Sequence, residues 1–129
     1  MTWKPSELEK EIEIIPGDFS ARVRDAYDHE SKASGADTTT VIFEITEEGK
    51  NKGLRVYDHF SKAHPVSQRR MMLLLRAVGL LEKEEVASED LIGKELRIKV
   101  ATEKFDGLPQ ARVKRYLAAD GKMQLSKKV

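Results

Sequence analysis

The stretch TTTVIFEITEEGKNKGLRVYDHF, residues 38–60, decides the fold. Its first part, residues 38–46, places Val41, Phe43 and Ile45 at alternate positions on one face and has high β-propensity throughout, which favours a strand. The cluster EEGKNKG at 47–53 is typical of a turn. The alternation resumes in LRVYDHF at 54–60 and predicts a second strand, antiparallel to the first.

The segments on either side of this hairpin extend the pattern. Upstream, residues 19–24 alternate between apolar and polar side chains and predict another strand. Downstream of Pro65, apolar residues recur three and four positions apart and predict a helix that ends near Gly79. Two further alternating segments, 96–100 and 111–117, predict the last two strands.

The predicted order, β-β-β-α-β-β, is that of the OB-fold, a mainly β architecture in which five strands form a partly open Greek-key barrel. The second and third strands and their loops form the usual ligand face of such barrels. We therefore expect an OB-like barrel over residues 16–118, with one α-helix between its third and fourth strands. Residues 1–15 are expected to form an N-terminal strap or short helix, and residues 119–129 a basic C-terminal tail.

Composition limits the classes of protein to consider. A chain of 129 residues is the size of one domain, and its formal net charge of +1 gives by itself no sign of nucleic-acid affinity. The absence of cysteine excludes disulfides and thiolate-bound metals. The N-terminus lacks the pattern of a secretory signal, and no apolar run approaches the length of a membrane span. We therefore expect a cytoplasmic protein that does not associate with membranes.

The outward positions of the predicted strands combine cations with flat rings. Lys and Arg can follow the phosphates of a single strand, and aromatic rings can stack on its bases. In the last strand, Val113 and Leu117 are expected to face inward while Tyr116 faces outward. Residues 94–116 carry seven basic and three acidic side chains, which predicts a basic hairpin. The candidate nucleic-acid-binding residues are Arg22, Arg24, Arg55, Tyr57, His59, Arg97, Lys99, Lys104, Phe105, Arg112, Lys114 and Tyr116.

Simpler interpretations stay open for the same residues. Charged side chains at alternate strand positions are commonly the solvated side of an antiparallel sheet. Phe105, in the turn before the last strand, can equally serve as a loop anchor, and either Tyr57 or Tyr116 can pack over a barrel end.

No arrangement of residues predicts an active site. His29 and His59 stand beside carboxylates in the sequence, but neighbours on a strand point to opposite faces and do not converge on a metal. The sequence contains no nucleophile elbow, phosphate-cradling loop or dinucleotide-binding fingerprint. We therefore expect neither enzymatic activity nor a metal or cofactor.

The chain also resembles a family of phage-encoded proteins, the domain of unknown function 669 group, over residues 14–117. The matching segments, in chain order, are IPGDFSARV, VIFEITEEGKNKGLRVYD, LLRAVGL, LIGKELRIKV and FDGLPQARVKRY. Members are generally regarded as single-stranded DNA-binding proteins of replication and recombination modules. The resemblance implies an OB-like barrel that coats single strands in the host cytoplasm, beside a recombinase or helicase. One departure is the tail DGKMQLSKKV, which is basic where many such proteins end in acidic residues.

These observations predict sequence-tolerant binding of single-stranded DNA. The alternative is a protein–protein interaction module of a recombination complex that makes no direct contact with DNA. A small hydrolase or nuclease is a third alternative and has the least support. Exposed edge strands are compatible with a homodimer or a cooperative array on DNA. The sequence does not distinguish DNA from RNA as the ligand.

Overall fold

The computed structural model describes residues 16–30, 35, 37–105 and 107–119, and in these ranges the protein is mainly β. An α-helix, α2 (Pro65–Ala77), stands between the third and fourth strands, and a short 3₁₀ helix, η1 (Ser88–Leu91), follows it. The predicted order of five strands and a helix is confirmed. The strands are β1 (Gly17–Glu30), β2 (Asp37–Ile45), β3 (Arg55–Ser61), β4 (Glu95–Phe105) and β5 (Leu108–Ala118).

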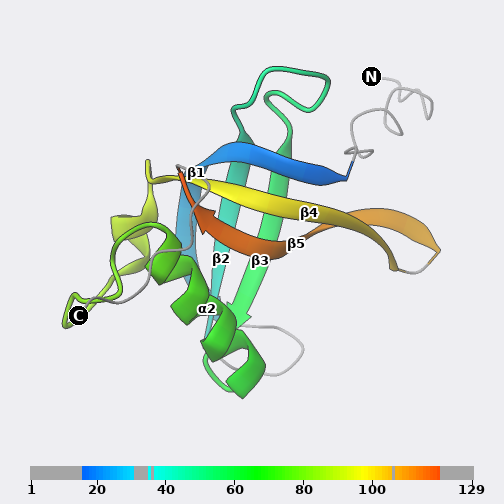
Figure 1. Ribbon diagram of the computed structural model, residues 1–129. Coiled ribbons are helices and arrows are strands. Elements are labelled where there is room, and N and C mark those ends of the chain that lie inside the picture. Colours follow the sequence, from blue (N-terminus) through cyan, green and yellow to red (C-terminus); the bar gives the residue numbers. More distant parts are fainter. Residues whose placement is uncertain (1–15, 31–34, 36, 106, 120–129) are drawn as a thin grey trace, which may run out of the picture.

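β1 is the centre of a five-stranded antiparallel sheet with the strand order β3-β2-β1-β4-β5. Its first part, residues 17–22, pairs with β4, and residues 21–30 pair with β2. The two partners pair with largely different parts of β1, and Figure 1 shows β4 and β5 lying across the direction of β2 and β3. The β4–β5 hairpin projects beyond the rest of the sheet.

A β-bulge in β1 resets the alternation of its side chains. Val23 and Asp25 pair with consecutive residues of β2, so Arg24 is an extra residue between them. Such an insertion reverses which of the following side chains face each side of the sheet. Val23 and Ala26 are both buried although three positions separate them. Tyr27 therefore turns away from the core.

A second bulge, in β5, overturns the predicted orientation of Tyr116. Val113 and Arg115 pair with consecutive residues of β4, so Lys114 is the extra residue here. Tyr116 consequently faces inward and is only 8% exposed, and Leu117 takes the outward position. Because no base can reach the buried ring, the prediction that Tyr116 belongs to a binding surface is wrong.

Tyr116 instead belongs to a buried polar cluster with Asp58 and Arg70, which we call the inner triad. The Tyr116 hydroxyl donates to the Asp58 carboxylate, while Arg70 donates to the same carboxylate and to the Tyr116 oxygen, the latter at 2.6 Å. Burial, followed by the charge of Asp58, raises the pKa of Tyr116. Burial disfavours the charge of Arg70, but the hydrogen bonds and charges of Asp58 and Tyr116 together outweigh this, so the pKa of Arg70 is raised. The inner triad joins β3, α2 and β5.

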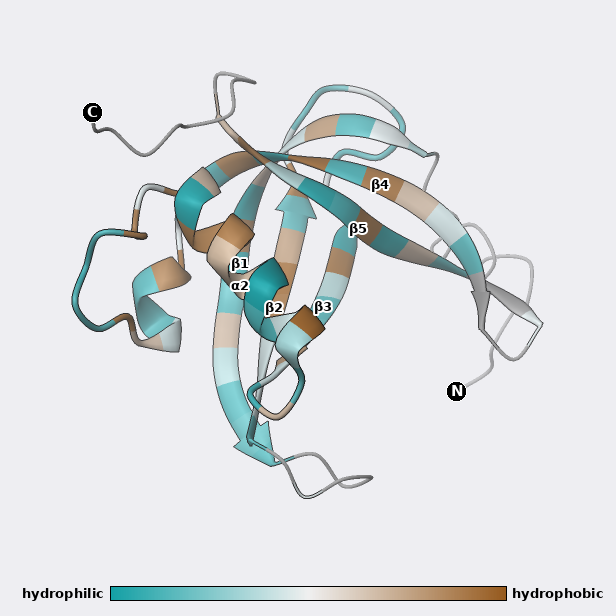
Figure 2. Cartoon of the chain, turned by 60° about the horizontal axis from the view of Figure 1, so that its bottom comes forward, coloured by the Kyte–Doolittle hydropathy of each residue, from teal (hydrophilic) through white to brown (hydrophobic). Residues whose placement is uncertain are grey.

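The core lies between the sheet and α2. All five strands contribute to it, and apolar segments alternate with polar ones along the strands in Figure 2. Pro65 begins α2 at little cost, because the first N–H groups of a helix lack helical partners in any case. Gly79 ends it with a φ of 79°, and the Leu80 N–H bonds to the Leu75 carbonyl. The largest fully buried side chains are Phe43, Ile45, Leu74, Leu91, Leu96 and Ile98.

The predicted terminal segments lie largely outside the residues that the structure describes. β1 begins at Gly17 and β5 ends at Ala118. The predicted strap over residues 1–15 and residues 120–129 of the predicted tail lie outside the described residues. Of the described helices, none combines the length and apolar character needed to cross a membrane.

Candidate nucleic-acid interface

The side of β1, β2 and β3 that faces away from the core carries a continuous set of polar and aromatic side chains, which we call the outer face. Residues directly opposite each other on neighbouring strands share one side of a sheet. Two rows cross the three strands in this way, with Arg22, Glu44 and Arg55 in one and Tyr27, Thr40 and His59 in the other. Tyr57 pairs with Ile42 in the row between them.

The first row forms the basic end of the outer face. Arg24 contacts the Glu44 carboxylate at 2.9 Å, and Arg22 lies 3.9 Å from its other oxygen. Arg22, Arg24 and Arg55 are all exposed. Guanidinium groups bind phosphates in the same fork geometry that they use for carboxylates. Glu44 therefore holds a position that would suit a phosphate.

The second row, with its neighbours, forms the aromatic end. Tyr27 and Tyr57 are 44% and 50% exposed, so each presents much of its ring to solvent. The Thr40 hydroxyl lies 2.7 Å from His29 Nε2 and 2.8 Å from His59 Nδ1, which fixes both imidazoles. The His29 ring centre lies 5.7 Å from that of Tyr27 and 6.5 Å from that of His59. These rings form one patch of the kind on which bases stack.

The outer face is less basic than the strand pattern predicts. Its three arginines lie near Glu44 and the exposed Asp25, so three positive charges face two negative ones. The Asp25 carboxylate also accepts the Ala26 N–H at 2.9 Å. A ligand of this surface therefore has to gain affinity from ring contacts as well as from charge.

Two further candidates, Arg97 and Lys99, lie on β4. Arg97 donates to Glu47 Oε1 and Ser20 Oγ, each at 3.0 Å, and to the Asp18 carbonyl at 3.3 Å. The Ser20 N–H and then the Arg97 guanidinium hold the pKa of Glu47 below its usual value. Arg97 thus joins β4 to β1 and to the segment after β2, whereas Lys99 is exposed.

The predicted basic hairpin neutralises part of its own charge. Glu103 on β4 forms ion pairs with Lys114 and with Arg112, whose Nε lies 4.0 Å away. The hydrogen bond from Lys114 lowers the pKa of Glu103. The side chains of Lys104 and Phe105 lie outside the described residues, so their roles stay predictions.

Three residues of the aromatic end are absent from the sequence-based prediction of the binding surface: Tyr27, His29 and Thr40. Strict alternation from the start of β1 places Tyr27 and His29 inside, and the bulge at Arg24 moves them outside. Two signals were available: the spacing of two between Tyr27 and His29, and the apolar Ala26 three positions after Val23. Nothing local to Thr40 indicates that its hydroxyl lies between two histidines.

Comparison with protein families finds a match over nearly the whole chain. The family described as "Protein of unknown function (DUF669)" matches residues 1–123. The chain belongs to this family. No curated protein matches it. The DUF669 match includes both rows of the outer face and the inner triad.

The outer face of this DUF669 protein offers guanidinium donors for anions and ring surface for flat ligands. Among the described residues, no group of three or more His, Asp or Glu side chains is arranged to hold a metal ion.

Proposed function

We propose that this protein binds single-stranded DNA on its outer face, with little dependence on base sequence, in phage-type DNA replication or recombination within the host cytoplasm. The observation that carries the proposal is the juxtaposition of exposed tyrosines and exposed arginines on three adjacent strands. Stacking of a base on an aromatic side chain is worth roughly 1–3 kcal/mol and works for every base. A strand that runs from the aromatic end to the basic end meets rings for its bases and cations for its phosphates.

We also propose that the sheet forms an OB-type barrel, in which β1, β2 and β3 are the ligand face. The division of β1 between two partners and the position of α2 after β3 support this architecture. Contact between the two edge strands supports it further, because Tyr116 of β5 donates to Asp58 of β3.

Glu44 suggests how a strand docks at the basic end. Its carboxylate now contacts Arg22 and Arg24, and a phosphate that enters takes over these contacts. The gain in charge contacts is therefore smaller than the number of arginines suggests. We expect a shallow dependence of affinity on salt, since each phosphate neutralised contributes roughly 0.7 to the logarithmic slope for a single strand.

Fluorescence anisotropy tests the proposal. A labelled oligothymidylate and a labelled duplex of equal length are titrated with the protein at two salt concentrations. The proposal predicts tighter binding of the single strand and weaker binding at the higher salt. Equal affinity for both, or no binding at the lower salt, would contradict it.

The second candidate function is docking to another protein of the same machinery, such as a recombinase or helicase. The exposure of Val66 and Met72 on α2, at 72% and 50%, favours it. This alternative predicts that replacing both by Ser abolishes binding to a purified phage recombinase or helicase, and that the wild-type protein does not bind a single strand. Loss of single-strand affinity in Tyr57→Ala supports the first function instead.

A further inference from the structure

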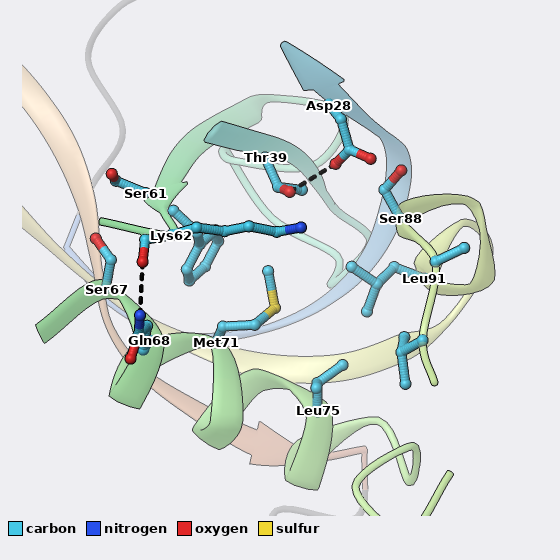
Figure 3. Close-up of a pocket in the computed structure, with 13 residues that line it drawn as sticks. Asp28, Thr39, Ser61, Lys62, Ser67, Gln68, Met71, Leu75, Ser88 and Leu91 are labelled. Atoms are coloured by element: carbon cyan, nitrogen blue, oxygen red, sulfur yellow. Dashed lines mark hydrogen bonds between the residues drawn. The ribbon is translucent and has the colours of Figure 1, made fainter. Parts of the chain in front are cut away.

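A cleft of about 260 Å³ lies at the other side of the sheet, between the end of β3, α2 and η1. Its apolar lining consists of Phe60, Met71, Leu75, Val86, Ala87 and Leu91. Figure 3 shows Met71, Leu75 and Leu91 on one side of the opening, opposite the ends of β1 and β2. The floor of the cleft can therefore take a flat apolar surface, and the Met71 thioether is a favourable partner for an aromatic ring.

The rim of the cleft carries charges of both signs. The Asp28 carboxylate is held in place by the Thr39 hydroxyl, which donates to it at 2.6 Å. Lys62 extends across the opening in Figure 3 and forms no ion pair with any residue that the structure describes. A ligand that enters here meets an oriented acceptor and an available donor above an apolar floor.

The cleft is continuous with the outer face around the end of the sheet. A second depression is lined by Asp28, Thr39 and Lys62, which also line the cleft, by His29 of the aromatic end, and by Glu30, Asp37 and Thr38. A strand that leaves the aromatic end past His29 thus meets residues that also line the cleft, and its phosphates have to stay clear of the Glu30 and Asp37 carboxylates.

We propose that the cleft receives one unpaired guanine base from a single strand; the inference rests on the proposed function. Guanine combines a ring face for the apolar floor with both kinds of polar group on its edges. Its O6 and N7 accept from Lys, and its ring N–H and amino group donate to a carboxylate. An apolar peptide side chain would fill the floor equally well but would leave the Asp28 carboxylate and the Lys62 ammonium facing carbon.

Methyl NMR of the full chain tests the site without a strand. The methionines are labelled at the ¹³C-methyl, Met71→Leu assigns the Met71 signal, and dGMP or dTMP is added. dTMP is the control ligand, because thymine lacks the amino group that guanine offers to a carboxylate. The proposal predicts a saturable shift of the Met71 methyl with dGMP, a weaker response to dTMP, and no shift of Met72, which does not line the cleft.

Two variants locate the contacts. Asp28→Asn keeps an acceptor for Thr39 but replaces one carboxylate oxygen by a donor, so the preference for dGMP over dTMP should fall at least roughly fivefold. Lys62→Ala should weaken dGMP binding, whereas Lys50→Ala, an exposed lysine in the turn between β2 and β3, should not.

Three results overturn the proposal. One is a Met71 methyl that dGMP does not move, and another is an equal shift of Met71 and Met72. The third is a shift with N-acetylphenylalanine but not with nucleotides, which assigns the cleft to a peptide. Tyr57→Ala separates binding at the cleft from binding at the outer face. If the proposal is correct, the Met71 methyl of this variant responds to dGMP as in wild type even where single-strand affinity is lost. If the Met71 methyl responds to dGMP but the wild-type protein binds no single strand, the guanine site in the cleft is supported and the proposed single-strand function is contradicted.

Discussion

The outer face and the inner triad each contain one of the two tyrosines that strand alternation places together on a polar surface. Tyr57 is 50% exposed on the outer face, and its ring faces solvent. Tyr116 is 8% exposed, and its hydroxyl is bonded to Asp58 and Arg70 between β3, β5 and α2. The same residue type therefore presents an exposed ring in one region and joins three elements in the other.

The difference arises from the extra residue of a β-bulge and not from the tyrosines themselves. Tyr57 lies on β3, where alternation is unbroken from Arg55 to Ser61. Tyr116 lies beyond the extra residue Lys114, and the reversal of faces carries its ring inward. A polar side chain placed inside must find partners, and Asp58 and Arg70 supply them. Variants of the outer face are thus expected to change single-strand affinity, and variants of the inner triad to change the free energy of unfolding.

Removal of Asp58 is expected to have the largest effect. Asp58→Ala leaves the Arg70 guanidinium and the Tyr116 hydroxyl without their shared acceptor, and breaking a buried ion pair costs on the order of 3 kcal/mol. Urea unfolding followed by circular dichroism should show this decrease in the free energy of unfolding. Asp18→Ala, which removes an exposed carboxylate, is the control and should change it by no more than about 0.5 kcal/mol. Similar values for both variants would contradict the role of the inner triad.

Tyr57→Ala is expected to separate function from stability. Loss of one stacking ring should weaken single-strand binding roughly tenfold, while the free energy of unfolding stays within about 0.5 kcal/mol of wild type. Anisotropy and urea unfolding on the same samples measure both quantities. Tyr57→Phe keeps the ring and should keep the affinity. Full affinity in Tyr57→Ala would place the strand elsewhere on the protein.

Tyr116→Phe is expected to change how stability depends on alkaline pH. The folded protein raises the pKa of Tyr116, so above a pH of about 10 the unfolded chain releases this proton while the folded chain keeps it. The unfolded state then binds fewer protons, and stability falls as pH rises, by up to about 1.4 kcal/mol per pH unit. Urea unfolding between pH 9 and 11 should show a steeper decline in wild type than in Tyr116→Phe. Parallel curves would contradict the burial of this hydroxyl.

Glu44→Gln is expected to have the smallest effect, and its sign is informative. The neutral side chain no longer competes with a phosphate for Arg22 and Arg24, so single-strand affinity should rise a few-fold and depend more steeply on salt. Anisotropy across a salt series measures both changes. Glu48→Gln alters a carboxylate that pairs with Lys52 in the turn after β2 and should leave both quantities as in wild type. Weaker binding by Glu44→Gln would mean that the carboxylate supports the site.

The strands and helix were predictable from sequence because their signals are local. The shared face of Val41, Phe43 and Ile45 and the three- and four-residue spacing after Pro65 reflect the side of each element that packs in the core. The bulge in β1 left only a weak local signal, the apolar Ala26 three positions after Val23, and the bulge in β5 was not predictable, because an extra residue is defined by the strand it fails to pair with. This is why Tyr27 joins the outer face and Tyr116 leaves it. The pairing of Arg112 and Lys114 with Glu103 was hidden for the same reason, since it spans two strands.

The three tyrosines of the chain, Tyr27, Tyr57 and Tyr116, test the central claim in one measurement. The rings are labelled with ¹³C, assigned by Tyr→Phe variants, and followed by NMR as an oligothymidylate is added. The account predicts that the signals of Tyr27 and Tyr57 shift on binding while the signal of Tyr116 stays in place. A strand that binds but moves Tyr116 alone, or moves none of the three, would contradict a stacking surface on the outer face.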